Sequence, residues 1–421
     1  MKNKIFLALS ILIIPLATVF AQVNNITLDY CKELSIKNYP GIKQKALIEQ
    51  SKNYQINNAT KAYLPQISIN AQASYQSDVT KLPIDNLPFK VQSLDKDQYR
   101  ITADINQVLF DGGNTSLQKE IQQKQAELEQ EKIELELYKV KERVTQIYFS
   151  ILILNESEKQ LDITKTDLES NLKKLQILKD NGLAFKSNVD QLKAELLKLK
   201  QRSTELSNTK TAYIQMLSLF MGTELKSTDV FVAPEKPVAN NLIKRPELRM
   251  FDKQNELLAT QNKFSLVKSL PKASLFAQGG YGKPGLNMLK NDFEWFYIGG
   301  LRVNWVFSNL YTFGKERKIN AINRDIIQIQ NENFLLQTQI NLKQQDSEIT
   351  KLKQLIETDE ELVQLRQDIK KTSEIRLQNG LIGATDYIND LNQEEISRQN
   401  KFIHETQLLM ALYQYQLISG N

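Results

Sequence analysis

Residue types that carry most enzyme and metal chemistry are scarce in this chain of 421 residues. Cys31 is its single cysteine, and His404 is its single histidine. Zinc sites need several such ligands, and general-base catalysis most often uses histidine. The Gly-x-Ser-x-Gly and His-x-x-His spacings are absent, and the 6 methionines form no cluster that would suit a soft metal. We therefore predict that the protein is not an enzyme and has no cofactor and no metal site.

The charged residues are dense but balanced. Lys and Arg number 54 and Asp and Glu number 49, and the two signs alternate along the long segments. This pattern is typical of solvated helix surfaces, and it leaves no basic face for nucleic acid.

Residues 1–21 are predicted to be a signal peptide. Lys2 and Lys4 precede an apolar run from Ile5 to Phe20, and Ala21 completes a small-residue cleavage site. Cys31 lies well beyond that run, so we expect no lipid attachment. After Phe20 the sequence has no apolar stretch near the about 20 residues that a spanning helix needs. Any membrane span is therefore expected to be β.

Strands are predicted where apolar and polar residues alternate. The first follows Leu64-Pro65, and strands are expected at about 67–75, 99–108, 273–281 and 296–306. Their length suits a tilted crossing of a bilayer. In the first strand one face is apolar, from Ile67 to Tyr75, and is expected to meet lipid. The opposite face is expected to line water, and it consists of Ser68, Asn70, Gln72 and Ser74.

Long helical hairpins are predicted after each pair of strands. A sharp turn at Asp111, Gly112 and Gly113 opens the first hairpin, about 113–221, and Gly182 caps its first helix. No Gly or Pro lies between that turn and Gly182, and apolar residues recur with a heptad period. Each long helix would measure roughly 100 Å. The second hairpin is expected at about 315–418.

The chain is a tandem duplication. Leu64-Pro65 returns as Leu270-Pro271, and Pro40 returns as Pro246 at the same offset. The predicted repeats are 22–230 and 231–421. The fold class is therefore dominated by α-helix with membrane β, built twice from two strands and one long helical hairpin. Small spanning barrels begin at about eight strands, so several copies must contribute strands, and this count alone allows a dimer, trimer or tetramer.

Together these features resemble the TolC-like outer-membrane efflux proteins. The resemblance covers essentially the whole chain after the signal peptide. It rests on the duplicated plan, both Leu-Pro elements, the segment Leu109 to Gly113, Tyr148-Phe149, and Gly-Leu at both hairpin tips.

The resemblance implies a homotrimer whose twelve-stranded β-barrel lies in outer-membrane lipid and continues as a long α-helical coiled-coil barrel in the periplasm. It also implies an exit duct that passively conducts substrates. Its partners would be a periplasmic adaptor (membrane fusion) protein and, indirectly, an inner-membrane transporter.

The resemblance also assigns site residues. Gly182, Leu183, Gly380 and Leu381 match the tips on which the adaptor docks in the family, although Asn181 and Asn379 stand where the family usually has valine. Asp386 matches a position of the family's entrance ring, where carboxylates would select cations. The next ring position holds Asn389. The family's lock between its hairpins is not matched, because its places are held by Asn188, Leu377 and Ile382.

Two other readings stay open at this point. The chain could be a periplasmic coiled-coil adaptor or scaffold whose strands form a soluble sheet without a membrane barrel. An exported hydrolase is the third reading, but the sequence has no set of residues that could form its catalytic site. Within the duct reading, drugs, metal ions and secreted proteins are equally compatible as substrates.

Overall fold

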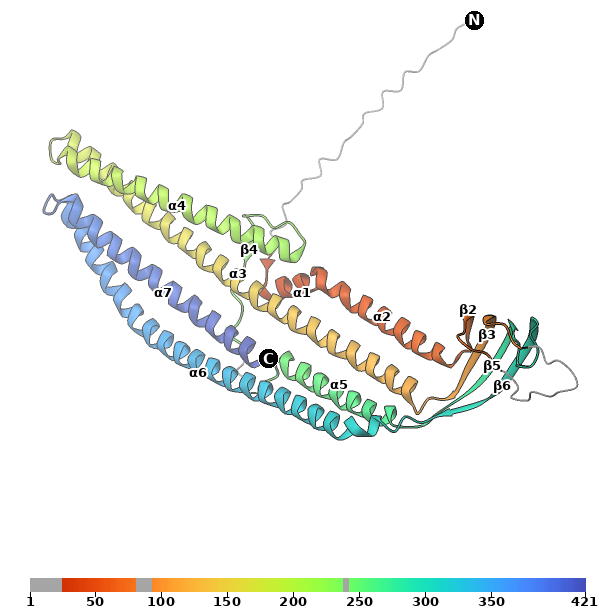
Figure 1. Ribbon diagram of the computed structural model, residues 1–421. Coiled ribbons are helices and arrows are strands. Elements are labelled where there is room, and N and C mark those ends of the chain that lie inside the picture. The colour runs from red at the N-terminus through yellow and green to blue at the C-terminus, as the bar shows by residue number, and fades with distance from the viewer. Residues whose placement is uncertain (1–24, 81–92, 238–241) are drawn as a thin grey trace, which may run out of the picture. The chain divides into compact units, whose positions relative to one another are not determined.

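The computed structural model describes residues 25–80, 93–237 and 242–421 (Figure 1). The predicted signal peptide, 1–21, lies outside these residues. Helices make up most of the described chain, as the sequence predicts. They are α1 (Leu28–Asn38), α2 (Lys43–Thr60), α3 (Asn114–Asp180), α4 (Lys186–Met221), α5 (Pro246–Lys268), α6 (Asn309–Gln378) and α7 (Ala384–Ser419). None of the helices in the described ranges combines the length and the apolar character needed to cross a membrane.

Four strands form one antiparallel sheet in the order β2-β3-β5-β6 (Figure 1). They are β2 (Gln66–Tyr75), β3 (Asp97–Phe110), β5 (Lys272–Lys283) and β6 (Glu294–Asn304). The central pair joins the two predicted repeats, with Ile101 opposite Tyr281. β6 ends before Trp305, whereas the alternation had predicted a strand to 306. The Trp305 indole instead donates a hydrogen bond to the Ser269 carbonyl at 3.0 Å, and this bond directs the chain toward the end of α5.

The chain divides into two compact units, which are described separately. The first comprises Met1–Ser35, Val144–Glu235 and Asp359–Thr406. The second comprises Ile36–Arg143, Lys236–Thr358 and Gln407–Asn421. Both units draw residues from each predicted repeat, because α3, α6 and α7 supply residues to both.

The core of the first unit lies among α3, α4, α6 and α7. The heptad seam predicted from the sequence is buried there through Leu168 of α3 and Leu192 of α4. The second hairpin adds Leu377, Tyr387 and Leu391 to the same cluster. The apolar residues of the heptad pattern therefore pack the first hairpin against the second as well as its own two helices against each other.

A short parallel strand pair also belongs to the first unit. β1 (Asn25–Ile26) pairs with β4 (Val230–Phe231). Tyr148 is fully buried below this pair, and its hydroxyl lies 2.7 Å from the Ile26 carbonyl oxygen and 2.6 Å from that of Val232. The tyrosine thus ties the segment at Ile26 and the connector after α4 to α3.

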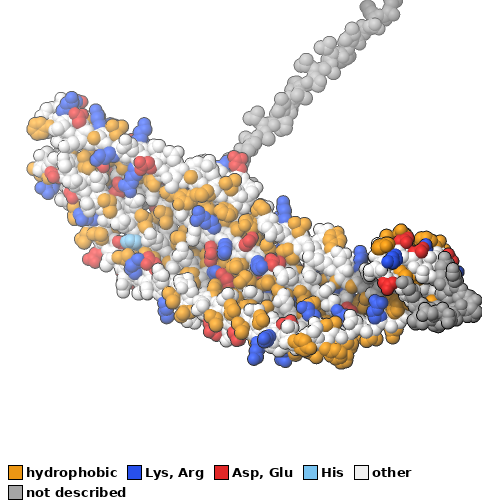
Figure 2. All heavy atoms as spheres, in the orientation of Figure 1, with side chains coloured by type: hydrophobic (Ala, Val, Ile, Leu, Met, Phe, Trp, Pro, Cys, Tyr) orange, Lys and Arg blue, Asp and Glu red, His pale blue; other side chains and the backbone are white. Residues whose placement is uncertain are grey.

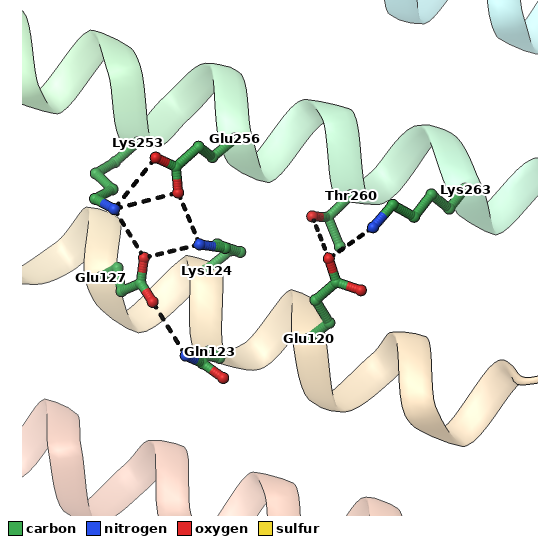
Figure 3. A network of polar contacts seen from close by, with 8 residues as sticks. All are labelled: Glu120, Gln123, Lys124, Glu127, Lys253, Glu256, Thr260 and Lys263. Atoms are coloured by element: carbon green, nitrogen blue, oxygen red, sulfur yellow. Dashed lines mark hydrogen bonds and ion pairs between the residues drawn. The ribbon is translucent and has the colours of Figure 1, made fainter.

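In the second unit an ion-pair network joins α3 to α5 (Figure 3). Lys124 contacts Glu256 at 2.7 Å, and Lys253 contacts Glu127 at 3.1 Å. The hydrogen bond from Lys124 is the main reason that the pKa of Glu256 lies below its ordinary value. Because one partner in each pair comes from each repeat, the network fixes the register between the two halves of the duplication.

A second polar cluster of this unit surrounds Arg245. Its guanidinium donates hydrogen bonds to Glu142 at 2.9 Å and to Glu247 at 3.0 Å, and it lies 4.6 Å from the centre of the Tyr138 ring. Burial raises the pKa of Tyr138 to about 12. Arg245 therefore holds α3 against the start of α5.

Helix α6 begins earlier than the sequence suggested. The second hairpin was expected from about 315, but α6 already starts at Asn309 and contains Gly314. One glycine inside a helix costs about 1 kcal/mol relative to alanine, which a helix of 70 residues readily tolerates. Gly314 therefore does not mark the start of the helix.

Candidate functional site

The strand-to-helix turn is built around the Asp111 carboxylate. It accepts hydrogen bonds from the backbone N–H groups of Gly113 at 2.9 Å and Thr115 at 2.7 Å, and from the Tyr63 hydroxyl at 2.8 Å. Burial alone would raise the pKa of Asp111, but these hydrogen bonds outweigh it and hold the pKa below its ordinary value. Asp111 thus caps the first turn of α3, where backbone donors lack partners within the helix.

The two glycines of this turn have left-handed backbones, with φ of 71° at Gly112 and 87° at Gly113. A Cβ on Gly112 would lie 3.1 Å from the Leu270 Cβ, which is the leucine of the second Leu-Pro element. The turn of one repeat therefore packs closely against the start of the other repeat's strand, and a side chain at Gly112 would require Leu270 to shift.

The sheet brings the predicted polar residues together on one face. Ser68, Asn70, Gln72 and Ser74 lie opposite Asp104, Thr102, Arg100 and Gln98 of β3. Asn70 donates a hydrogen bond to Asp104 at 2.7 Å, and the Thr102 hydroxyl donates to the same oxygen at 3.0 Å. The polar face thus extends across strands and is hydrogen-bonded along its surface.

The opposite face of the sheet is apolar and largely exposed. In β2 the side chains of Ile67 and Ile69 are 71% and 78% exposed. The same face continues through Ile101 and Tyr281 to Trp295, which is 81% exposed. Over the helices, by contrast, Figure 2 shows charged side chains of both signs scattered among apolar ones. Among the described residues Phe293 stacks on Tyr99 and Tyr281 of this face, while most of its other apolar side chains stay exposed.

Both edges of the sheet are open within the described ranges. There β2 pairs only with β3, and β6 pairs only with β5. Each outer edge therefore presents backbone donors and acceptors without a strand partner, which is the arrangement that accepts a further strand.

The hairpin tips carry two identical helix ends. At the end of α3, Gly182 N–H donates to the Lys179 carbonyl at 2.9 Å and Leu183 N–H to the Leu178 carbonyl at 2.8 Å. At the end of α6, Gly380 N–H donates to Leu377 at 3.0 Å and Leu381 N–H to Arg376 at 2.8 Å. Both are Schellman caps, in which the glycine supplies the left-handed residue.

The leucines that follow these caps are exposed. Leu183 is 71% and Leu381 is 70% exposed, so most of each side chain faces solvent. Phe185, also exposed, is the N-cap of α4 in an extended conformation. Ser187 lies inside the helix, and no side-chain hydrogen bond caps α4.

Asp386 lies in the first turn of α7, where its carboxylate accepts a hydrogen bond from the Gly383 N–H at 3.2 Å. Asp386 and Asn389 are both exposed. Of the unmatched lock positions, Leu377 and Ile382 belong to the apolar core of the first unit. A different polar contact links the hairpins there, because buried Asn171 of α3 donates to the Tyr387 hydroxyl of α7 at 2.7 Å.

The family model described as outer membrane efflux protein matches residues 33–222. The match covers somewhat less than half of the chain, which over that segment is similar to the outer membrane efflux proteins. The predicted family resemblance is thereby confirmed. None of the curated proteins matches the chain in sequence.

Three solved channels share the fold of this chain. The outer-membrane channel OprN is 13% identical, with a TM-score of 0.68 over 94% of this chain and 90% of its own. The CmeC outer membrane channel of Campylobacter jejuni is 14% identical, with a TM-score of 0.65 over 93% and 85%. The MtrE outer membrane channel of Neisseria gonorrhoeae, in its open state, is 11% identical, with a TM-score of 0.65 over 93% and 88%. At such identities the likeness establishes the fold.

Proposed function

We propose that this protein is an outer membrane efflux protein, an exit duct in the outer membrane that passively conducts substrates out of the cell. The observation that carries the proposal is the four-stranded sheet, which has one polar face, one apolar face and two open edges. The match to the family model over residues 33–222 supports efflux and an outer-membrane location.

The open edges support assembly from several copies. Backbone groups without partners cost several kcal/mol each in lipid, so strands that span a membrane must close into a barrel. β6 of one copy pairs with β2 of the next in this proposal. Three copies give the twelve-stranded β-barrel of a homotrimer, with the apolar face toward lipid and the polar face toward water.

The exposed leucines at the hairpin tips support docking of a partner. Fully burying a leucine side chain stabilises a complex by about 1.5–3 kcal/mol. Leu183 and Leu381 are held outward on rigid caps, so they are available for that burial. We assign them, with Gly182 and Gly380, to a periplasmic adaptor, through which the duct works with an inner-membrane transporter. The helices form the periplasmic extension, and Asp386 stands at its entrance.

Fractionation of cells that express the full chain tests this proposal. The protein should appear in the outer-membrane fraction as a trimer that resists sodium dodecyl sulfate until heated. A monomer released with the soluble periplasmic proteins would contradict the duct and would favour the adaptor or scaffold reading.

A further inference from the structure

Two arginines on the polar face of the sheet lie over phenylalanine rings. The Arg302 guanidinium carbon is 4.6 Å from the centre of the Phe276 ring, and that of Arg100 is 5.6 Å from the centre of the Phe296 ring. Cation–π attraction of this kind operates within about 6 Å. The four residues come from three strands, β3, β5 and β6.

A glycine directly opposite each ring makes room for it. Phe276 is paired with Gly300, and Phe296 is paired with Gly280. A Cβ would lie 3.1 Å from the Phe276 ring at Gly300 and 2.5 Å from the Phe296 ring at Gly280. The rings therefore lie on the backbone of the neighbouring strand. They form two fixed platforms on which the guanidinium groups rest.

The one carboxylate between these platforms is held by other partners. Asp104 accepts hydrogen bonds from Asn70 at 2.7 Å, from Thr102 at 3.0 Å and from Gln278 at 2.5 Å. No ion pair in the described part of the chain involves Arg100 or Arg302. Beside Arg302 a hollow of about 240 Å³ is also lined by Asp104, Phe276 and Gln278. Both guanidinium groups thus keep donors that a solute can use.

The charge of the polar face follows from the register of the four strands. Its positive residues are Arg100, Lys272 and Arg302, and its negative residues are Asp104 and Glu294. Three positive against two negative charges leave one net positive charge per chain. A net positive charge on a wall facing confined water raises the local concentration of anions.

We propose that Arg100 and Arg302 form an anion-binding step on the polar face of the sheet, which favours passage of solutes that carry carboxylate or phosphate groups. This inference rests on the proposed function, in which that face lines the duct. Guanidinium groups bind such anions through paired hydrogen bonds, and the phenylalanine platforms hold them flat against the wall. The step is distinct from the carboxylate of Asp386, which lies in another element and favours cations.

Reversal potentials in planar lipid bilayers under a KCl gradient test the inference on the full-length protein. Replacing both residues, in Arg100→Gln with Arg302→Gln, should lower the chloride-to-potassium permeability ratio about twofold or more. The change should be larger at 0.1 M than at 1 M salt, because the Debye length falls from about 10 Å to about 3 Å. Asp104→Asn should shift the ratio in the opposite direction, so the test does not depend on one variant folding.

Arg317→Gln is the matched control, because Arg317 lies 5.8 Å from the centre of the Phe313 ring but on helix α6. It should leave the ratio unchanged. Channels that conduct with the same ratio in all variants would overturn the anion-binding step while the duct itself stands. An equal shift in Arg317→Gln would also overturn it. A wild-type protein that inserts but carries no current would overturn the proposed function together with the step.

Discussion

Gly182 and Gly380 end helices α3 and α6 with the same left-handed backbone, at φ 74° and φ 70°. No heavy atom outside their chain neighbours would lie within 4 Å of a Cβ at either position. The constraint at both glycines is therefore the backbone angle and not lack of space. Proline would be incompatible with that angle and would remove the N–H that closes each cap. Proline substitutions would thus disturb the tips, and the leucines offer a cleaner test of docking.

We expect Leu183→Ser combined with Leu381→Ser to abolish transport without loss of trimers. Both side chains are exposed, so their removal costs the isolated fold little, while each deletes about 1.5–3 kcal/mol of apolar burial in a complex. Drug accumulation in cells and co-purification with the adaptor would measure the effect. Leu197→Ser, at another exposed leucine on α4, should behave as wild type. Full transport by the double variant would remove the tips as the docking site.

Asp111 is expected to make the free energy of unfolding depend on pH. Its pKa is lower in the folded chain than in the unfolded chain, so its contribution is fully present above the unfolded value, near 3.9, and is lost as pH falls through the folded value. Asp111→Asn should cost about 1–2 kcal/mol at pH 7, and the difference from wild type should vanish well below pH 3.9. Urea unfolding in detergent at several pH values measures the difference in free energy of unfolding between Asp111→Asn and wild type. Asp162→Asn, at an exposed carboxylate, is the control. A difference that persists in acid would mean that the capping charge is not the cause.

Tyr387 is expected to stabilise the packing of the two hairpins through Asn171. Tyr387→Phe keeps the ring in the core but removes the hydroxyl that accepts the 2.7 Å hydrogen bond, so we expect a loss of about 0.5–1.5 kcal/mol. Thermal unfolding followed by circular dichroism would measure it. Tyr30→Phe is the control, because that side chain is half exposed. Equal stability of Tyr387→Phe and wild type would show that the buried hydrogen bond contributes nothing net.

Asp386 is expected to set cation preference at the entrance. Asp386→Asn should lower the potassium-to-chloride permeability ratio, and Asn389→Asp should raise it by adding a second carboxylate one helical turn further on. Asp390→Asn, at a carboxylate that accepts a hydrogen bond from Ser373, should change the ratio less. Reversal potentials under a KCl gradient measure the potassium-to-chloride permeability ratio of all three variants. Unchanged selectivity in the first two variants would remove Asp386 as the entrance ring.

Features that follow from local pattern were predictable from the sequence, whereas contacts between distant segments were not. Period-two alternation marked β2 and β5 within one or two residues at each end. Glycines with positive φ marked both helix ends. The start of α6 was missed because Gly314 has no obligatory left-handed role there.

The aromatic platforms and the Arg245 cluster depend on register between strands or helices that are far apart in the chain. Phe276 is an apolar residue on the polar face, but nothing in the sequence indicates that it lies opposite Gly300 and beneath Arg302. The link between Asn171 and Tyr387 was hidden for the same reason. Two glycines opposite aromatic residues in neighbouring predicted strands would have been the usable signal.

The central claim is that copies of this chain form a water-filled duct through the outer membrane. The most direct test is single-channel recording of the purified, heat-modifiable oligomer in planar lipid bilayers. We predict discrete, long-lived conductance steps from the trimer and none from the heat-dissociated chain. Insertion of the intact oligomer without any conductance, or recovery of a soluble monomer as the native form, would contradict the claim.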